Sequence, residues 1–497
     1  MRSLFLASFF AIPLLALEVD PIYQSHMVLQ QGRQVPVCGT ASGSEPVVVS
    51  FGSQRVEAKK KGKKWQAVLE PMAVQAEGAP LTITQGKESV TLEDVVVGEV
   101  WLASGQSNML FRMDETGDSA SMASAPVPAF RYYNAEPQVR TTPTAYTKDM
   151  REKLAAGKMF VGGWSLSGPD TCRPMSAVGW YFGKKLQTLL SDTTTVPVGV
   201  VHVSLGGSEM MAWMPPSLLK KKYKDCLDSR WLESKYISPW VRMRGRQNMG
   251  EELNSPHPFK PGYLFETGMT PWLQFPFAGV IWYQGESDAE IQDQTQNHSL
   301  LTDLISSWRA EFKAPKMPFI MVQLPRINDT GPKSIRLFWP EFRQVQQQVA
   351  NEMPGVMCVT TLDLGSTDSD VHPRRKLEVG ERLATVAAAQ VYDKQGVAFS
   401  GPIVDEVKPQ AGKLCVKFTH AEGLKTKDGK APVGFEVSAN GKIYHPAEAE
   451  IRGESVLLSS PKVKKPKYAR YGWAVYIEPN LVNEAGLPAV PYSPNRK

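Results

Sequence analysis

The chain has 497 residues, of which 42% are hydrophobic and 21% charged, and its net charge is +6. This length predicts about three domains, and the balance of residues supports a sizeable core rather than a disordered chain. The small net charge gives no reason to expect a nucleic-acid partner. The sequence contains neither a nucleotide-binding glycine motif nor a spacing typical of metal ligands. We therefore expect no cofactor and no bound metal.

The first residues combine one arginine with a short apolar stretch. Arg2 precedes an apolar run over residues 4–17, which is shorter than a membrane span and contains Pro13. This pattern is typical of a secretory signal peptide. We predict a signal peptide over residues 1–16 and a secreted or periplasmic protein. No later stretch reaches about 18 uninterrupted apolar residues, so we expect no membrane span in the mature chain.

Residues 17–95 and residues 396–497 share one pattern. Both segments contain short stretches of alternating apolar and polar residues, separated by turns rich in Gly, Lys and Pro. Such alternation with turn punctuation is typical of antiparallel β-structure. We predict an N-terminal β-sandwich domain over residues 17–95 and a C-terminal β-domain over residues 396–497.

The middle of the chain, residues 96–395, contains near-continuous apolar runs. These runs are Glu99–Ser104, Val196–Leu205, Ala278–Gln284, Pro318–Leu324 and Val356–Leu364. Helix-like segments accompany them, for example over residues 301–312 and 376–391. Apolar strands that alternate with helices favour an α/β fold in which both faces of a parallel sheet are covered.

Polar motifs follow the five apolar runs. The motifs are, in order, GQSN, GGSE, GES, PR and, slightly later, DVHP. Ligands of open α/β sheets bind beyond the carboxyl ends of the strands. Five polar strand ends at one edge of a sheet therefore predict a single crevice that serves as the functional site.

Ser107 lies just past the first run and is a candidate nucleophile. Met109 occupies the second glycine position of the GxSxG elbow, which disfavours the common α/β-hydrolase fold. Among the seven histidines, His372 lies beyond the fifth run and has Asp370 two residues before it. A serine, a histidine and a carboxylate around one crevice match the logic of a catalytic triad. The alternative without catalysis is that Ser107 only caps a helix and that His372 lies in an ordinary loop before a helix.

Ester cleavage also requires donors for the developing oxyanion. Gly206 and Gly207 follow the second run and allow close approach of the backbone, which can present an N–H group. Gln284 ends the third run and can supply a side-chain amide, with Glu286 shortly after it. The alternatives are an ordinary glycine turn and a buried, structurally satisfied glutamine.

The motifs together resemble a known family. GEVWLASGQSNM, GVVHVSLGGSEMMAWMP, GVIWYQGESDA, FWPEFRQVQ and DVHPRRKLEVGERLA are similar to the sialate O-acetylesterase family, within the SGNH/GDSL-type hydrolases. PIYQSHMVLQ near the start and RYGWAVYIEPNLVNEAGLPAVPY near the end resemble its flanking regions, so the resemblance covers nearly the whole mature chain. It implies a five-stranded parallel flavodoxin-like (SGNH hydrolase) core flanked by N- and C-terminal β-domains. It also implies removal of O-acetyl groups from sugars, typically sialic acids.

The resemblance also implies roles for particular residues. Carried over by position, Ser107 is the nucleophile, His372 is the base, and Gly206 or Gly207 and Gln284 match the oxyanion blocks. Neither the motifs nor the resemblance identifies substrate-binding residues or an oligomeric state.

The chain departs from the family pattern near the acid of the triad. In simpler relatives the acid lies three residues before the histidine, and here that position is Ser369. Asp370 is the first candidate for the orienting carboxylate, and Asp368 or Asp363 remain alternatives. The family often has Asn after QGES, where this chain has Asp288.

We therefore expect a secreted serine carbohydrate O-acetylesterase whose partner is an O-acetylated sugar or glycan. Three alternatives remain. An acetyl-xylan or other polysaccharide deacetylase fits the same scaffold. A glycoside hydrolase with paired carboxylates, for instance Glu286 with Asp370, leaves the GQSN turn unexplained. A carbohydrate-binding protein without catalysis suits the β-domains but leaves the serine, histidine and oxyanion motifs without a role.

Overall fold

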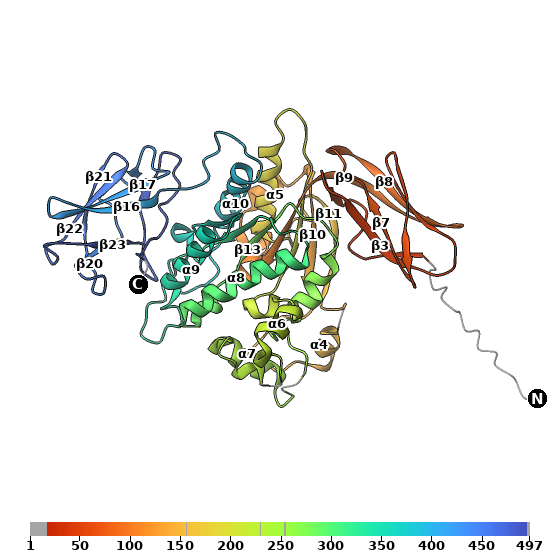
Figure 1. Cartoon of the computed structure of the whole chain (residues 1–497), viewed down its shortest axis with the longest axis horizontal. Coiled ribbons are helices and arrows are strands. Elements are labelled where there is room, and N and C mark those ends of the chain that lie inside the picture. The colour runs from red at the N-terminus through yellow and green to blue at the C-terminus, as the bar shows by residue number, and fades with distance from the viewer. Residues whose placement is uncertain (1–16, 156, 229, 253–254, 495–497) are drawn as a thin grey trace, which may run out of the picture.

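The computed structural model describes residues 17–494, except residues 156, 229 and 253–254. The predicted signal peptide over residues 1–16 lies outside the described residues. Figure 1 shows an N-terminal β-region (red) and a C-terminal β-region (blue) at opposite ends of a mixed α/β body. The α/β class predicted from the alternating pattern is confirmed. Within the described residues, no helix is long and apolar enough to cross a membrane.

One large sheet forms the body of the molecule. Its main path runs in the order β11-β10-β12-β9-β13-β14-β15. All neighbouring strands from β10 to β15 pair in parallel, and β11 lies antiparallel on the edge. The strands are β9 (Glu88–Gly105), β10 (Val127–Pro137), β11 (Phe160–Ser167), β12 (Val198–Ser204), β13 (Gly279–Tyr283), β14 (Phe319–Val322) and β15 (Val356–Val359).

Helices cover both faces of this sheet, which explains why its strands are apolar on both sides. Alternate side chains of β9 separate into two cores. Trp101 packs with α5 (Ala177–Leu190) and α10 (Lys376–Gln390), whereas Leu102 packs with α8 (Gln294–Glu311) and α9 (Trp339–Glu352). Shorter helices border the carboxyl edge of the sheet or the segments around it: α1 (Ser107–Leu110), α2 (Met113–Thr116), α3 (Ser119–Ala123), α4 (Lys148–Lys153), α6 (Pro216–Lys222) and α7 (Pro239–Met249).

The sheet is wider than the five apolar runs predict. Strand β10 adds a sixth parallel strand beside β12, and β11 closes that edge. The β10 segment reads VPAFRYYNAEP, and its two prolines and its polar residues hide the strand pattern. Both prolines lie near the ends of the strand, where a missing N–H is tolerated.

The N-terminal strands form two packed layers that share one core. One layer is the antiparallel sheet β1-β3-β7-β6, and the other consists of β4, β5 and β8, which join β9. Strand β9 continues from this region into the central sheet, so the predicted boundary between residues 95 and 96 falls inside one strand. The strands are β1 (Leu17–Val19), β2 (Val28–Gln30), β3 (Val35–Ala41), β4 (Val47–Phe51), β5 (Gln54–Glu57), β6 (Lys59–Lys61), β7 (Lys64–Leu69) and β8 (Gln75–Gln85).

The C-terminal region has its own apolar core, separate from the two cores of the central sheet. Its strands form the sheets β16-β17-β22-β21, β20-β19-β23 and β18-β24. They are β16 (Ile403–Gln410), β17 (Lys413–Thr419), β18 (Lys425–Thr426), β19 (Phe435–Ser438), β20 (His445–Pro446), β21 (Glu448–Arg452), β22 (Ser455–Ser459), β23 (Tyr468–Tyr471) and β24 (Leu481–Val482).

Candidate active site

The turn after β9 is held in a shape that requires glycine. Gly105 has a φ of +142°, and a Cβ there would lie 2.1 Å from the carbonyl oxygen of Tyr283. The next residue, Gln106, is tied to the end of β13. Its N–H donates to the Tyr283 carbonyl (3.0 Å), and its side-chain oxygen accepts from the Gly285 N–H (3.2 Å). These contacts place Ser107, the first residue of α1, just beyond the edge of the sheet.

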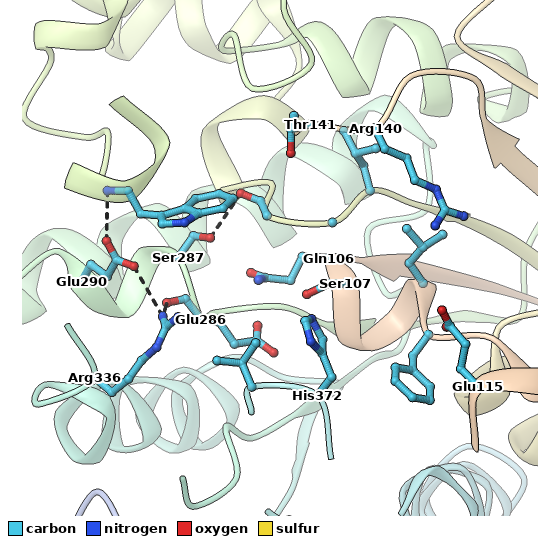
Figure 2. A pocket seen from close by; sticks show the side chains of 17 residues that line it. Gln106, Ser107, Glu115, Arg140, Thr141, Glu286, Ser287, Glu290, Arg336 and His372 are labelled. Carbon is cyan, nitrogen blue, oxygen red and sulfur yellow. Dashed lines mark hydrogen bonds and ion pairs between the residues drawn. The ribbon is translucent and has the colours of Figure 1, made fainter. Parts of the chain in front are cut away.

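Ser107 lines a cavity of about 420 Å³ beyond the carboxyl ends of the strands. Gly206, Gly207 and His372 line the same cavity, and Figure 2 shows the Ser107 hydroxyl and the His372 ring both pointing into it. The other lining residues are Gln106, Leu110, Phe111, Glu115, Arg140, Thr141, Leu205, Trp240, Glu286, Ser287, Glu290, Arg336 and Val371. A cavity therefore lies where the strand-end motifs predict one.

His372 is positioned by its own loop and by one aromatic ring. The imidazole stacks on Phe111, with ring centroids 6.4 Å apart, and its Nδ1 lies 3.3 Å from the Asp370 carboxylate. Because Nδ1 faces the carboxylate, Nε2 is the nitrogen left for the serine. Within the described residues, the Ser107 hydroxyl has no hydrogen-bond partner. Catalytic hydrogen bonds in ligand-free sites often form only when substrate binds.

The three candidate orienting carboxylates have different partners. Asp363 is paired with both terminal nitrogens of Arg382, at 2.7 and 2.8 Å. Asp368 accepts the Asp370 N–H (3.0 Å) and so shapes the loop. Of the three, Asp370 is the one in contact with the His372 ring, although its side chain is 57% exposed. A solvated carboxylate orients an imidazole less firmly than a buried one, because water weakens the interaction.

Gly206 and Gly207 present backbone beside the serine. A Cβ on Gly206 would lie 3.5 Å from the Ser107 Cβ, which shows how closely the two segments approach. Gly207 has a φ of +74°, and the Trp240 ring packs against its Cα, so a side chain there would clash. No acceptor among residues 17–494 as described binds the N–H of either glycine. Unpaired N–H groups next to a serine are suited to hold an oxyanion.

Unlike Ser107, His372 and the two glycines, Gln284 does not line the cavity. It is 1% exposed, and its amide nitrogen donates to the Ser208 carbonyl (3.2 Å) and to the Asp288 carboxylate. Both amide hydrogens therefore have buried acceptors. These contacts match the alternative of a buried structural glutamine more closely than the role of an oxyanion donor.

A cluster of buried carboxylates, Glu209, Asp288 and Glu290, lies near Gln284, and Glu290 also lines the cavity. Burial raises the pKa of Asp288 to about 7. Burial also raises the pKa of Glu290 to about 7, against the opposing charge of Arg336 at 3.4 Å. The pKa of Glu209 is raised by burial and by the neighbouring Asp288 charge. Part of the cluster is therefore protonated near neutral pH.

The sequence motifs did not identify several residues at or beside the cavity. Asn108 and Lys376 belong to the GQSN and DVHPRRK motifs, and this position within a motif is a signal that could have identified them. Arg140, Trp240 and Arg336 lie in segments without an apolar run or a recognised motif, so the sequence held no comparable signal for them.

No group of His, Cys, Asp and Glu side chains in the described part of the chain is arranged to hold a metal ion. The five cysteines are present as free thiols. The chemical groups in the cavity are thus a hydroxyl, an imidazole, carboxylates, guanidinium groups and backbone N–H groups.

Comparison with known proteins finds relatives that are similar in sequence. Residues 269–389 match the family model described as carbohydrate esterase, sialic acid-specific acetylesterase. The human sialate O-acetylesterase is 27% identical over 453 residues, which covers 83% of this chain and 78% of the human protein. The mouse sialate O-acetylesterase is 26% identical over 468 residues, with 83% and 80% covered.

A solved structure is similar over almost its whole length. The crystal structure of a carbohydrate acetylesterase from Xanthomonas citri has a TM-score of 0.79 and 26% identity, and the match covers 96% of this chain and 99% of that one. These matches confirm the resemblance to the sialate O-acetylesterase family and the expectation of an esterase.

Proposed function

We propose that this relative of the sialate O-acetylesterases is a serine carbohydrate O-acetylesterase that removes O-acetyl groups from sialic acids. One observation carries the proposal. A serine, a histidine in contact with a carboxylate, and unpaired glycine N–H groups surround one cavity at the carboxyl edge of a parallel sheet. These are the groups that acyl transfer from an ester requires.

The reaction follows from their placement. The Ser107 oxygen attacks the acetyl carbonyl carbon while its proton passes to Nε2 of His372, and Asp370 at Nδ1 stabilises the resulting imidazolium. The negative oxygen of the tetrahedral intermediate accepts hydrogen bonds from the backbone N–H groups of Gly206 or Gly207. Collapse of the intermediate breaks the bond to the sugar oxygen, which takes the proton from His372. Water activated by the same imidazole then releases acetate from the serine.

The fold and the cell compartment are part of the same proposal. The strands β12-β9-β13-β14-β15 have the parallel order 2-1-3-4-5. Ser107 follows β9, the first of these strands in the chain, next to the switch point, and this order supports a flavodoxin-like SGNH core. We treat β10 and β11 as an extension of that core, and the two β-regions as flanking domains. The apolar N-terminal run supports secretion or export to the periplasm, and sequencing of the exported protein's N-terminus tests that part.

A polysaccharide deacetylase on the same scaffold is the main alternative, because the same cavity can hold another acetylated sugar. The hypothesis of a glycosidase has less support. Glu286 is 3% exposed and accepts a hydrogen bond from Asn108, so it is not placed as a solvent-accessible acid. Release of acetate with the glycosidic bonds unchanged separates the esterases from glycosidases and from binding proteins.

The deciding experiment measures acetate release from a panel of O-acetylated sialic acids and acetylated xylans. Wild type and Ser107→Ala are compared, with Ser119→Ala as a matched control, because Ser119 also begins a short helix but lies away from the cavity. We expect acetate from sialic acids with the wild type and the control alone. A serine-directed organophosphate should label Ser107. Preference for xylans would move the substrate to the alternative, and complete inactivation with labelling at another residue would overturn the serine assignment.

A further inference from the structure

A buried lysine lies directly behind the candidate catalytic residues. Lys376 is 1% exposed and begins α10, four residues after His372. Its ammonium donates a hydrogen bond to the side-chain oxygen of Asn108, the residue that follows Ser107. It also lies 4.8 Å from the centroid of the Phe111 ring, on which His372 stacks.

The Asn108 amide connects this lysine to two further segments. Its nitrogen donates to the carboxylate of Glu286 and to the carbonyl of Val371, the latter at 2.9 Å. A lysine ammonium can only donate, so the amide oxygen must face Lys376 and the amide nitrogen must face the two acceptors. The orientation of the amide therefore follows from the chemistry of its partners and is not ambiguous.

The positive charge of Lys376 and the negative charge of Glu286 lie on either side of the Asn108 amide and compensate each other. Lys376 and Glu286 are both buried, at 1% and 3% exposure, and each would be costly alone in an apolar surrounding. Burial lowers the pKa of Lys376 to about 7, while the charges of Glu286, Asp370 and Glu115 oppose that shift. Besides these three carboxylates, the ring of the buried Tyr283 faces Lys376, with its centroid 5.4 Å from the ammonium.

We propose that Lys376 is a positioning residue that acts through Asn108 and locks the turn carrying Ser107 to the loop carrying His372. The link runs from α10 to the first turn of α1 and from there to the carbonyl next to His372. It rests on the proposed function, because it assigns a role in the geometry of the serine–histidine pair. Loss of this connection shifts the reacting groups by a fraction of the distance between them. This shift lowers kcat and leaves substrate binding nearly unchanged.

A double-mutant cycle tests this link. Lys376→Met, Asn108→Ala and the double variant are compared with wild type for kcat and KM on 4-nitrophenyl acetate and for the rate of organophosphate labelling at Ser107. Lys184→Met is the matched control. Lys184 on α5 also lies over an aromatic ring, Trp180 at 4.8 Å, and donates one side-chain hydrogen bond, but it lies away from the cavity. Circular dichroism and thermal melting monitor the fold of every variant.

We expect each single variant to lower kcat by roughly 10²-fold with nearly unchanged KM. The double variant should lose the same factor, since both changes break one connection, whereas independent effects would multiply to roughly 10⁴. Lys184→Met should behave as wild type. Near-normal turnover in Lys376→Met, multiplying losses, or unfolding of both single variants would each overturn the proposal, the last by assigning the network to stability alone.

The pH profile gives a second result that a purely structural lysine would not change. In wild type, kcat/KM should fall above about pH 7, as Lys376 loses the charge that faces Glu286. Lys376→Met should lack this alkaline limb and keep the acid limb. If wild type neither hydrolyses acetyl esters nor is labelled at Ser107, the proposed function is wrong and this inference falls with it. If wild type is active and Lys376→Met matches it, only the inference is wrong.

Discussion

The ends of two neighbouring strands, β9 and β13, have the same local shape but opposite outcomes. Gly105 closes β9 with a φ of +142°, and Gly285 follows β13 with a φ of +145°. Past the first glycine, Ser107 lines the cavity. Before the second glycine, Gln284 is buried within the protein.

The contacts of each side chain account for the difference. The Gln284 amide meets a buried backbone carbonyl and the Asp288 carboxylate, which take both of its hydrogens. On the other strand, Gln106 makes the contacts to the sheet edge, so the hydroxyl of Ser107 is left facing the cavity. A strand end therefore locates the rim of a site, whereas the partners of each polar group decide whether it enters the site.

The largest test of this comparison is Ser107→Ala. We expect kcat to fall by up to roughly 10⁶-fold if serine and histidine act as a unit. The melting temperature should change little, because the hydroxyl has no hydrogen-bond partner among the described residues. Steady-state kinetics and thermal melting measure the two effects. Substantial residual turnover, with the fold intact, would mean that another group attacks the ester.

The next test concerns the carboxylate at His372. Asp370→Asn should lower kcat by at most roughly 10⁴-fold, the loss known for orienting carboxylates in serine proteases, because this carboxylate is exposed. Asp363→Asn and Asp368→Asn serve as controls and should cost far less activity, since one pairs with Arg382 and the other shapes the loop. A ranking with Asp368→Asn as the most damaging variant would move the orienting role to Asp368.

The parts of this architecture that depend on local pattern are predictable from sequence. The apolar runs marked the strands β9, β12, β13, β14 and β15, and the polar motifs after them marked the rim of the cavity. The run of residues 376–391 predicted α10 to within one residue. These features follow from burial on both faces of a parallel sheet, which leaves a visible apolar stretch.

The remaining features depend on contacts between distant segments. Strand β10 carries prolines and polar residues, so its pairing with β12 has no signal of its own. The direction of Gln284 is set by Asp288 and by a carbonyl 76 residues earlier in the chain. Lys376 follows two arginines at a helix start and so resembles a surface charge, although the fold buries it against Asn108.

Gln284→Ala tests the other half of this comparison, the buried glutamine at the end of β13. Removal of the buried amide leaves the Ser208 carbonyl without a donor and leaves the Asp288 carboxylate with the Met210 N–H, so we expect a loss of about 1–3 kcal/mol in unfolding free energy. Turnover of the folded variant should stay near normal. Gln347→Ala is the control, since Gln347 is a partly exposed glutamine on α9 that donates to Asn351. A fall in kcat of roughly 10²–10³ at normal stability would instead restore Gln284 as an oxyanion donor.

The last test concerns the carboxylate that accepts the hydrogen bond of Gln284. Burial raises the pKa of Asp288 in the folded protein from 3.8 to about 7. The folded state therefore binds the proton more tightly than the unfolded state, and the stability associated with that proton is lost as pH rises from about 4 to about 7. Asp288→Asn does not ionise, so its stability relative to wild type should grow over this window and then level off.

We expect that gain to be on the order of 1–3 kcal/mol at pH 7, because one unit of pKa shift corresponds to about 1.4 kcal/mol and ionised Asp288 also acts on the neighbouring Glu209, whose pKa it raises. Thermal melting of both proteins from pH 4 to pH 8 measures it, with Asp192→Asn, at a surface carboxylate paired with Lys394, as the control. A difference that stays constant with pH would mean that Asp288 is ionised throughout. In that case the Asp288 carboxylate would be negatively charged at every pH of the assay. It would then orient the Gln284 amide by an ion–dipole contact throughout.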